Sequence, residues 1–194
     1  MELFEAISTR RSIRRYTADP VDDDKVNKIL EAGRWAPSWA NTQCWRFVVV
    51  RDPEVKARIG QCLMGAKIEG KAVDNPATKA INTVPVLIVV CAEMNKSGCK
   101  PGDPTSKDFV TDKGDWFMFD TALASQNMVL AAHGLGLATV IMGAFDAPAV
   151  EEILGIPKGY RVVVLLPLGV PTWEGKAPPR KTLDEIVVHD QWDS

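Results

Sequence analysis

Two apolar stretches constrain the fold of this chain more than any other feature of its sequence: VPVLIVVCA at 84–92 and VVVLLPLGV at 162–170. Both are far shorter than the roughly 20 apolar residues that a membrane-spanning helix needs. A short apolar run without alternating polar positions is typical of a strand that is buried on both faces. The sequence therefore predicts two buried strands, the first of them central in a sheet.

The remaining segments show helical and extended patterns around these strands. The stretch 113–133 predicts a long helix that is buried centrally, because it is apolar on most sides. Asp52 followed by Pro53 is a typical helix start, and Asp22 or Asp23 can cap another helix. The expected elements are helices at 1–8, 22–33, 53 to about 82, 113–133 and 148–154, and strands at 44–51, 84–92, 137–145 and 161–169.

This order of elements predicts a three-layer α/β or α+β domain. We expect a single domain over residues 1–194, because the chain contains no linker, internal repeat or low-complexity block. Residues 95–112 form the least regular segment, which is either a surface loop or a flap over a pocket. Trp192, near the end of the tail at 170–194, has no evident partner within the chain.

Composition excludes several classes of protein. Hydrophobic residues make up 46% of the chain and charged residues 25%, which is ordinary for a folded globular protein. A net charge of −2 argues against a general nucleic-acid binder. The N-terminus lacks the order of a signal peptide, so we expect a cytoplasmic protein with no membrane partner. The four cysteines and two histidines lack metal-ligand spacing, so no metal site is expected.

The segment STRRSIRRY at 8–16 gathers four arginines near the N-terminus of this mildly acidic chain. Such a cluster is a solvated basic face, a nucleic-acid arm or a pocket for a small dense anion, and the aspartates at 19 and 22–24 would repel a polyanion. In an extended backbone Arg10, Ser12 and Arg14 would lie on one side, and the guanidinium fork suits phosphate. Arg15 lies on the other side and is expected to pair with an aspartate at 22–24.

Familiar catalytic and nucleotide-binding motifs are missing. The chain has no GxGxxG after a strand, no GxxxxGK[ST] and no GxSxG. The glycines of HGLGLAT at 133–139 follow a predicted helix and precede a predicted strand, so helix termination explains them better than a dinucleotide turn. Cys44 precedes a predicted strand and is interpreted as a packing residue. Three scattered pieces remain: the arginines at 10–15, PSWANTQ at 37–43 and PPRK at 178–181.

In type, order and spacing, these pieces resemble the FMN-dependent nitroreductases over about residues 2–188. RRSIRRY resembles the opening motif of that family, PSWANTQCW its loop, and MGAF at 142–145 its turn at the flavin edge. GYRVVVLLPLGVP and PPRKTLDEIV resemble its closing strand and phosphate-binding tail. The resemblance implies an α+β fold with a three-layer α/β/α sandwich. It also implies an intertwined homodimer with two FMN sites at the subunit interface.

The resemblance assigns FMN contacts position by position. Arg10 and Ser12 would bind the phosphate, with Arg180 or Lys181 closing on it. Arg14 would reach the ribityl chain or the pyrimidine edge of the flavin. The full set of implied cofactor-binding residues is Arg10, Arg11, Ser12, Arg14, Pro37, Ser38, Asn41, Ile141, Met142, Gly143, Ala144, Arg180 and Lys181.

The resemblance also implies contacts with the flavin ring. The loop residues Pro37, Ser38 and Asn41 would come from the other subunit, and the Gly143 amide would lie close to the flavin N5. The tail at 170–194 would pack on the partner subunit. The chain departs from the family at Cys44, where a proline is usual, and at Thr182, where some members have a second basic residue.

The implied activity is electron transfer from NAD(P)H to a nitroaromatic, a quinone or a related small acceptor by a ping-pong mechanism. Both substrates would use one pocket above the flavin, which carries the chemistry. Two alternatives keep the same FMN motifs. One is a specialised flavin reaction of the same family, such as reductive dehalogenation or flavin fragmentation. The other is a carrier or sensor that binds FMN without turnover.

Overall fold

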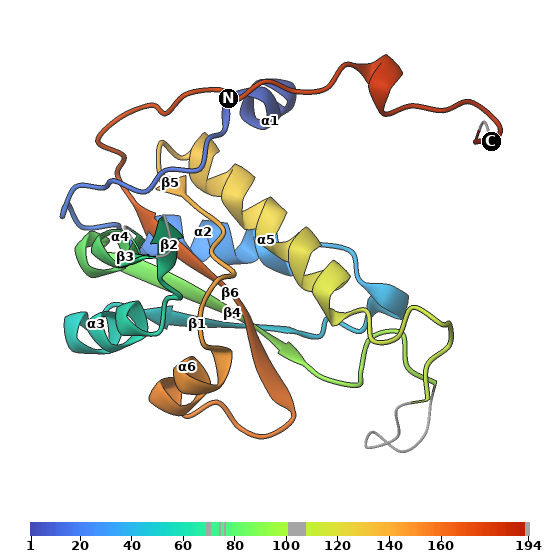
Figure 1. The fold of residues 1–194 in the computed structure, drawn as a ribbon, viewed down its shortest axis with the longest axis horizontal. Helices are drawn as coiled ribbons and strands as arrows, with labels where there is room; N and C mark the ends of the chain where they lie inside the picture. The colour runs from blue at the N-terminus through green and yellow to red at the C-terminus, as the bar shows by residue number, and fades with distance from the viewer. Residues whose placement is uncertain (69–70, 74, 76, 101–107, 193–194) are drawn as a thin grey trace.

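A four-stranded antiparallel sheet forms the centre of the computed structural model, which describes residues 1–68, 71–73, 75, 77–100 and 108–192 (Figure 1). The strands are β1 (Trp45–Val50), β4 (Val86–Glu93), β6 (Tyr160–Gly169) and β5 (Ala138–Thr139), in the order β1-β4-β6-β5. The helices are α1 (Leu3–Thr9), α2 (Asp23–Arg34), α3 (Pro53–Gln61), α4 (Ala77–Thr83), α5 (Phe117–Gly134) and α6 (Ala147–Leu154). These elements confirm the predicted α+β class.

The side chains of β4 alternate between two helical layers. Val86, Ile88 and Val90 belong to the core formed with α2 and α5. The alternate residues Leu87, Val89 and Cys91 belong to the core formed with α3, α4 and α6. Seven of the eight residues of β4 are buried, so the first apolar stretch is a central strand, as predicted. Helices on both faces of the sheet make the fold a three-layer sandwich (Figure 1).

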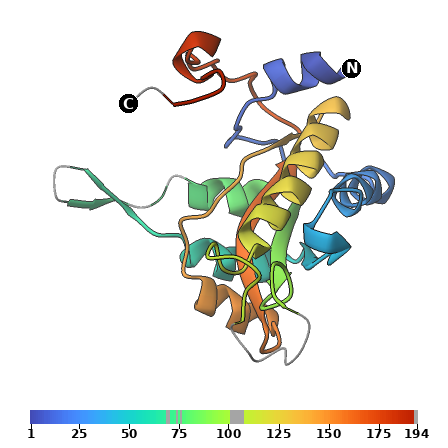
Figure 2. The ribbon, with the colours of Figure 1, turned by 90° about the vertical axis from the view of Figure 1, so that its right-hand side faces the viewer.

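The predicted helix start at Pro53 is confirmed. The Asp52 carboxylate accepts hydrogen bonds from the N–H groups of Glu54 and Val55 at 2.8 and 3.0 Å. These two donors have no partner inside the helix, so the aspartate satisfies them. The region after α3 departs from the prediction of one helical segment to about residue 82. It contains a hairpin of β2 (Ala66–Ile68) and β3 (Lys71–Val73), which projects from the body (Figure 2).

Backbone pairing across the chain explains why this helix ends early. Leu63 forms a β-bridge with Phe145, and the Met64 N–H donates to the Ala144 carbonyl at 3.0 Å. These groups are therefore committed to the segment before α6 and cannot continue α3. The strand expected at 137–145 is also shorter than predicted. Only Ala138 and Thr139, which form β5, pair continuously with β6, and Met142 forms a separate bridge with Leu165.

The long helix also differs from the prediction at its start. α5 begins at Phe117 rather than 113, because the Asp115 carboxylate accepts the Phe117 N–H at 3.1 Å. It is not buried on all sides: Met118 and Phe119 are each 56% exposed. Both lie at the start of the helix, where Asp120 and Thr121 are nevertheless buried at 1% exposure (Figure 1 shows the position of α5).

Apolar side chains are exposed at both ends of the chain. Leu3, Phe4 and Ile7 on α1 are at least half exposed, and Trp192 is 87% exposed. The tail passes α1 and then leaves the body of the molecule, with one 3-10 turn, η2 (Leu183–Glu185) (Figures 1 and 2). Several exposed apolar residues on one short helix, as on α1, are typical of an interaction site. Among the described helices, none combines the length and apolar character needed to cross a bilayer.

Candidate cofactor site

The arginine-rich segment follows α1 directly and runs extended beside β5. Ser12 forms a parallel bridge with Thr139, and the Ile13 N–H donates to the Thr139 carbonyl at 3.0 Å. Ile13 and Tyr16 are buried in the core, at 3% and 5% exposure. Their burial fixes the segment on the body of the protein and leaves the charged side chains between them at the surface.

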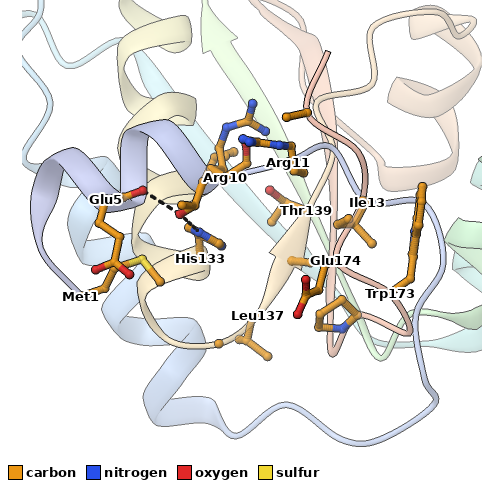
Figure 3. Close-up of a pocket in the computed structure, with 17 residues that line it drawn as sticks. Met1, Glu5, Arg10, Arg11, Ile13, His133, Leu137, Thr139, Trp173 and Glu174 are labelled. Carbon is orange, nitrogen blue, oxygen red and sulfur yellow. Dashed lines mark hydrogen bonds between the residues drawn. The ribbon is translucent and has the colours of Figure 1, made fainter. Parts of the chain in front are cut away.

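Arg10, Arg11 and Arg180 form a cationic cluster at the start of this segment. Burial, and after it the positive charges of Arg11 and Arg180, lowers the pKa of Arg10. No described carboxylate pairs with any of the three, and the Arg10 side chain donates no hydrogen bond within the described residues. Figure 3 shows the side chains of Arg10 and Arg11 close together. Uncompensated like charges at one place suit a polyvalent anion such as a phosphate monoester.

Arg11 is partly occupied within the chain. Its guanidinium donates to the carbonyls of Ser8 and Arg10 at 2.7 and 2.8 Å, at the C-terminal end of α1. Arg180 is held in the same way in the tail, where it donates to the carbonyls of Pro178 and Pro179. Of the cluster, Arg10 therefore has the side chain most available to a ligand.

A pocket of about 530 Å³ adjoins this cluster (Figure 3). Its wall includes His133 at the end of α5. The Thr9 hydroxyl donates its one proton to the Glu5 carbonyl at 2.6 Å, so it accepts from Nε2–H of His133 at 2.8 Å. Burial, and then the charges of Arg10 and Arg11, lowers the pKa of His133. This histidine joins α5 to the end of α1 beside the cationic cluster.

A second pocket of about 680 Å³ holds the other predicted members of the arginine segment. It is lined by Ser12 and Arg14, together with Lys79 of α4. The single face predicted for Arg10, Ser12 and Arg14 is therefore divided between two pockets, and Trp173 lines both. The sequence reasoning missed Lys79, because it lies in a short helix without a motif.

The expected ion pair of Arg15 with an aspartate at 22–24 was wrong. The Asp23 carboxylate pairs with Arg51 at 2.6 Å. The Arg15 guanidinium lies 6.0 Å from the ring centroid of Trp173 instead. The aromatic ring of Trp173 is therefore the neighbour of the Arg15 guanidinium, in place of the expected aspartate carboxylate.

The segment Ile141–Ala144 is exposed except at Met142. Met142 is 8% exposed and exchanges both backbone hydrogen bonds with Leu165, at 3.0 and 2.9 Å. Gly143 is exposed, and its N–H donates no hydrogen bond within the described residues. Ile141 and Ala144 are exposed as well and their N–H groups donate no hydrogen bond within the described residues, so three of the four predicted residues offer a backbone donor to a ligand.

The loop at 37–43 has an unusual backbone. Ala40, Asn41 and Gln43 all have positive φ angles, of 44°, 58° and 47°. Residues other than glycine adopt this region rarely, and Asn tolerates it better than most. The Ser38 hydroxyl accepts the Gln43 N–H at 3.0 Å across the loop. Such a conformation persists only where surrounding contacts enforce it.

The main contact that holds this loop is a buried carboxylate that the sequence reasoning missed. Asp120, in the first turn of α5, is 1% exposed and accepts the Trp39 N–H with both oxygens, each at 3.2 Å. In the sequence it is the only acidic residue of this helix. The only available signal was that a charge in a buried stretch requires partners.

The loop and the cationic cluster lie at opposite ends of α5 within one chain (Figure 1). Asp120 contacts the loop, and His133 lines the pocket beside the arginines. These residues are 13 positions apart in α5, which at the rise of a helix is about 20 Å. One chain therefore does not bring Pro37, Ser38 and Asn41 together with Arg10. Lys181 is exposed, and no described cluster of His, Cys, Asp and Glu could hold a metal ion.

Comparison with known proteins agrees with these features. A sequence model described as the Nitroreductase family matches residues 7–170. The chain therefore belongs to the nitroreductase family. Family membership confirms the expected class, a flavin oxidoreductase that uses FMN.

Three named proteins are similar to this chain. A solved nitroreductase family protein from Clostridium novyi NT is 31% identical, with a TM-score of 0.72 and coverage of 88% of this chain and 87% of that one. A protein of Thermus thermophilus named NADH dehydrogenase is 28% identical over 92% of this chain and 91% of its own length. Iodotyrosine deiodinase 1 of Rattus norvegicus is 29% identical over 96% of this chain and 69% of its own length.

Proposed function

We propose that this protein is a homodimeric FMN enzyme that passes electrons from NAD(P)H to a nitroaromatic, a quinone or a related small acceptor. The observation that carries this proposal is the cationic cluster around Arg10, which has no described carboxylate partner and adjoins a second cationic pocket. When bound, FMN supplies the two-electron chemistry. The protein supplies binding, orientation and charge.

Each of the two pockets would bind a different part of FMN. Arg10, with Arg180 and Lys181 of the tail, would hold the phosphate, and Arg11 would contribute charge. Ser12, Arg14 and Lys79 would face the ribityl chain and the polar edge of the ring. A cation at that edge favours the reduced flavin, which carries more negative charge. The free N–H of Gly143 is suited to a hydrogen bond at the ring.

Two features support a dimer in which each site uses both subunits. The loop that would line the ring contacts Asp120, and the arginines of the same chain lie beside His133, about 20 Å away along α5. The partner subunit would supply Pro37, Ser38 and Asn41. The exposed apolar residues of α1 and of the tail at 170–194 would pack on that partner, as obligate interfaces are large and apolar.

One pocket above the flavin would serve both substrates in turn, which predicts ping-pong kinetics. The absence of a glycine-rich dinucleotide motif from the sequence agrees with a single shared pocket. The Thermus thermophilus relative named NADH dehydrogenase supports a nicotinamide as donor. All four cysteines are free, which supports the proposed cytoplasmic location.

A second candidate is reductive dehalogenation, which the similarity to iodotyrosine deiodinase 1 favours. Binding of FMN without turnover is a third.

Stopped-flow absorbance at the flavin band tests all three. We expect NADH or NADPH to bleach the flavin within seconds and a quinone or nitroaromatic to restore it. Reoxidation by an iodinated phenol with iodide release, and by no quinone, would favour dehalogenation. A flavin that stays oxidised for minutes would leave binding alone.

A further inference from the structure

The carboxylate of Asp120 accepts hydrogen bonds from two separate segments of the chain. The Trp39 N–H donates to it from the loop at 37–43, and the Thr42 hydroxyl lies at 3.5 Å. The Ser97 hydroxyl donates to Oδ2 from the segment after β4. The Cys44 thiol lies 3.8 Å from the same oxygen. Two segments far apart in the sequence therefore share one buried acceptor.

No described cation lies within ion-pair distance of Asp120. Its charge is instead balanced by its hydrogen-bond donors and by the N-terminal end of α5, where the helix dipole favours a carboxylate. Burial, and after it the carboxylates of Asp120 and Asp115, raises the pKa of Cys44 to about 12, so this thiol keeps its proton and acts as a donor. Losing the acceptor would leave buried donors unpaired, which is costly.

The segment that carries Ser97 is fixed to the same end of α5. The Ser97 carbonyl accepts the Trp116 N–H at 3.0 Å, and the Asp115 carboxylate accepts the Asn95 N–H at 2.6 Å. The rings of Trp39 and Trp116 lie 4.9 Å apart between centroids. The described residues at 95–100 and 108–116 thus contact the loop through both a carboxylate and an aromatic pair. Residues 101–107 lie outside the described structure.

We propose that Asp120 is a positioning residue that couples the loop at 37–43 to the segment at 95–100 and 108–116. The proposal rests on the proposed function for its consequence, since that loop would line the flavin ring of the partner subunit. A shift in the segment reaches the loop through the shared oxygens of Asp120. Acceptor selectivity would then depend on residues of the segment that need not touch the acceptor.

Amide hydrogen exchange on the holoprotein tests the coupling directly. Asp120→Asn keeps the shape of the side chain but replaces one acceptor oxygen with a donor. It should speed exchange of the Trp39 amide about tenfold or more, because that N–H loses a charged acceptor. Ser97→Ala removes a donor that does not touch Trp39. It should nevertheless speed the same amide several-fold, since the two groups act through one carboxylate.

Ser125→Ala is the matched control. Ser125 is equally buried on α5, at 2% exposure, but its hydroxyl donates only to the Thr121 carbonyl within the helix. It should leave exchange at Trp39 unchanged. In kinetics, Asp120→Asn and Ser97→Ala should change the ratio of kcat/KM for bulky and small quinones, and their effects should not add. Ser125→Ala should leave this ratio unchanged.

The proposal is overturned if Ser97→Ala leaves the Trp39 amide as protected as in the parent, or if Ser125→Ala raises its exchange as much as Asp120→Asn does. It is also overturned if the two kinetic effects simply add. Because Ser97→Ala removes only one hydroxyl, it keeps the test decisive if Asp120→Asn fails to fold. If no acceptor is reduced at all, the proposed function fails, while the exchange experiment still decides the coupling.

Discussion

At the scale of single residues, the arginine cluster gives a direct test of cofactor binding. Arg10 is the member whose side chain is most available to a ligand, so Arg10→Ala should remove one charge-assisted phosphate contact of about 1.5–3 kcal/mol. FMN affinity should fall about tenfold or more. Riboflavin lacks the phosphate, so its affinity should be weak in the parent and unchanged in the variant. Fluorescence titration measures both, and equal parent affinities for FMN and riboflavin would refute the assignment.

His133 gives a prediction about pH. Its folded-state pKa lies below its ordinary value, mainly because of burial and then because of Arg10 and Arg11. As the pH falls below about 6.5, the unfolded chain binds the proton first, so stability is lost as the pH falls from there through the folded pKa. His133→Gln should therefore reduce the difference in melting temperature between pH 8 and pH 5.5 in the FMN-free protein. His189→Gln, in the exposed tail, is the matched control and should not. An unchanged difference in both variants would contradict this explanation.

At the scale of elements, two helices begin at an aspartate, but only one of these aspartates makes capping hydrogen bonds. Asp52 caps α3 with two hydrogen bonds, whereas Asp22 stands at the N-cap of α2 without one. Asp52→Ala should cost about 1 kcal/mol of unfolding free energy, within the usual range for a lost cap. Asp22→Ala should cost clearly less. Urea denaturation measures both, and equal losses would show that the capping bonds of Asp52 do not matter.

Elements that depend on local pattern could be predicted from the sequence, and those that depend on distant pairing could not. The apolar run of β4 and the Asp52–Pro53 start each determine their own structure locally. The early end of α3 depends on Met64 pairing with Ala144, about 80 positions away in the chain. The same holds for the candidate site. The arginine motif was visible, but the roles of Lys79 and Asp120 depend on which loops meet them in space.

At the scale of the whole molecule, the proposed site requires two chains, and subunit mixing tests this. Arg10→Ala should disable the phosphate contact of one subunit. Asn41→Val should disable the loop, because Asn41 has φ 58° and a β-branched residue tolerates that conformation poorly. Each variant alone should bind FMN weakly. In a mixed dimer, one site would carry both changes and the other would carry neither.

Refolding the two variants together in equal amounts should therefore restore parent-like FMN affinity in about a quarter of the sites, as random pairing into two-fold dimers predicts. Native mass spectrometry gives the fraction of mixed dimers, and FMN titration gives the fraction of tight sites. Mixed dimers without any tight site would place the loop and the arginines of one chain in the same site. A stable, FMN-loaded monomer at micromolar concentration would contradict the dimer itself.

Deleting residues 182–194 keeps Arg180 and Lys181, so it should weaken the dimer while the cationic residues remain. That separation matters because a loss of FMN after the deletion then follows from the lost partner loop and not from a lost charge.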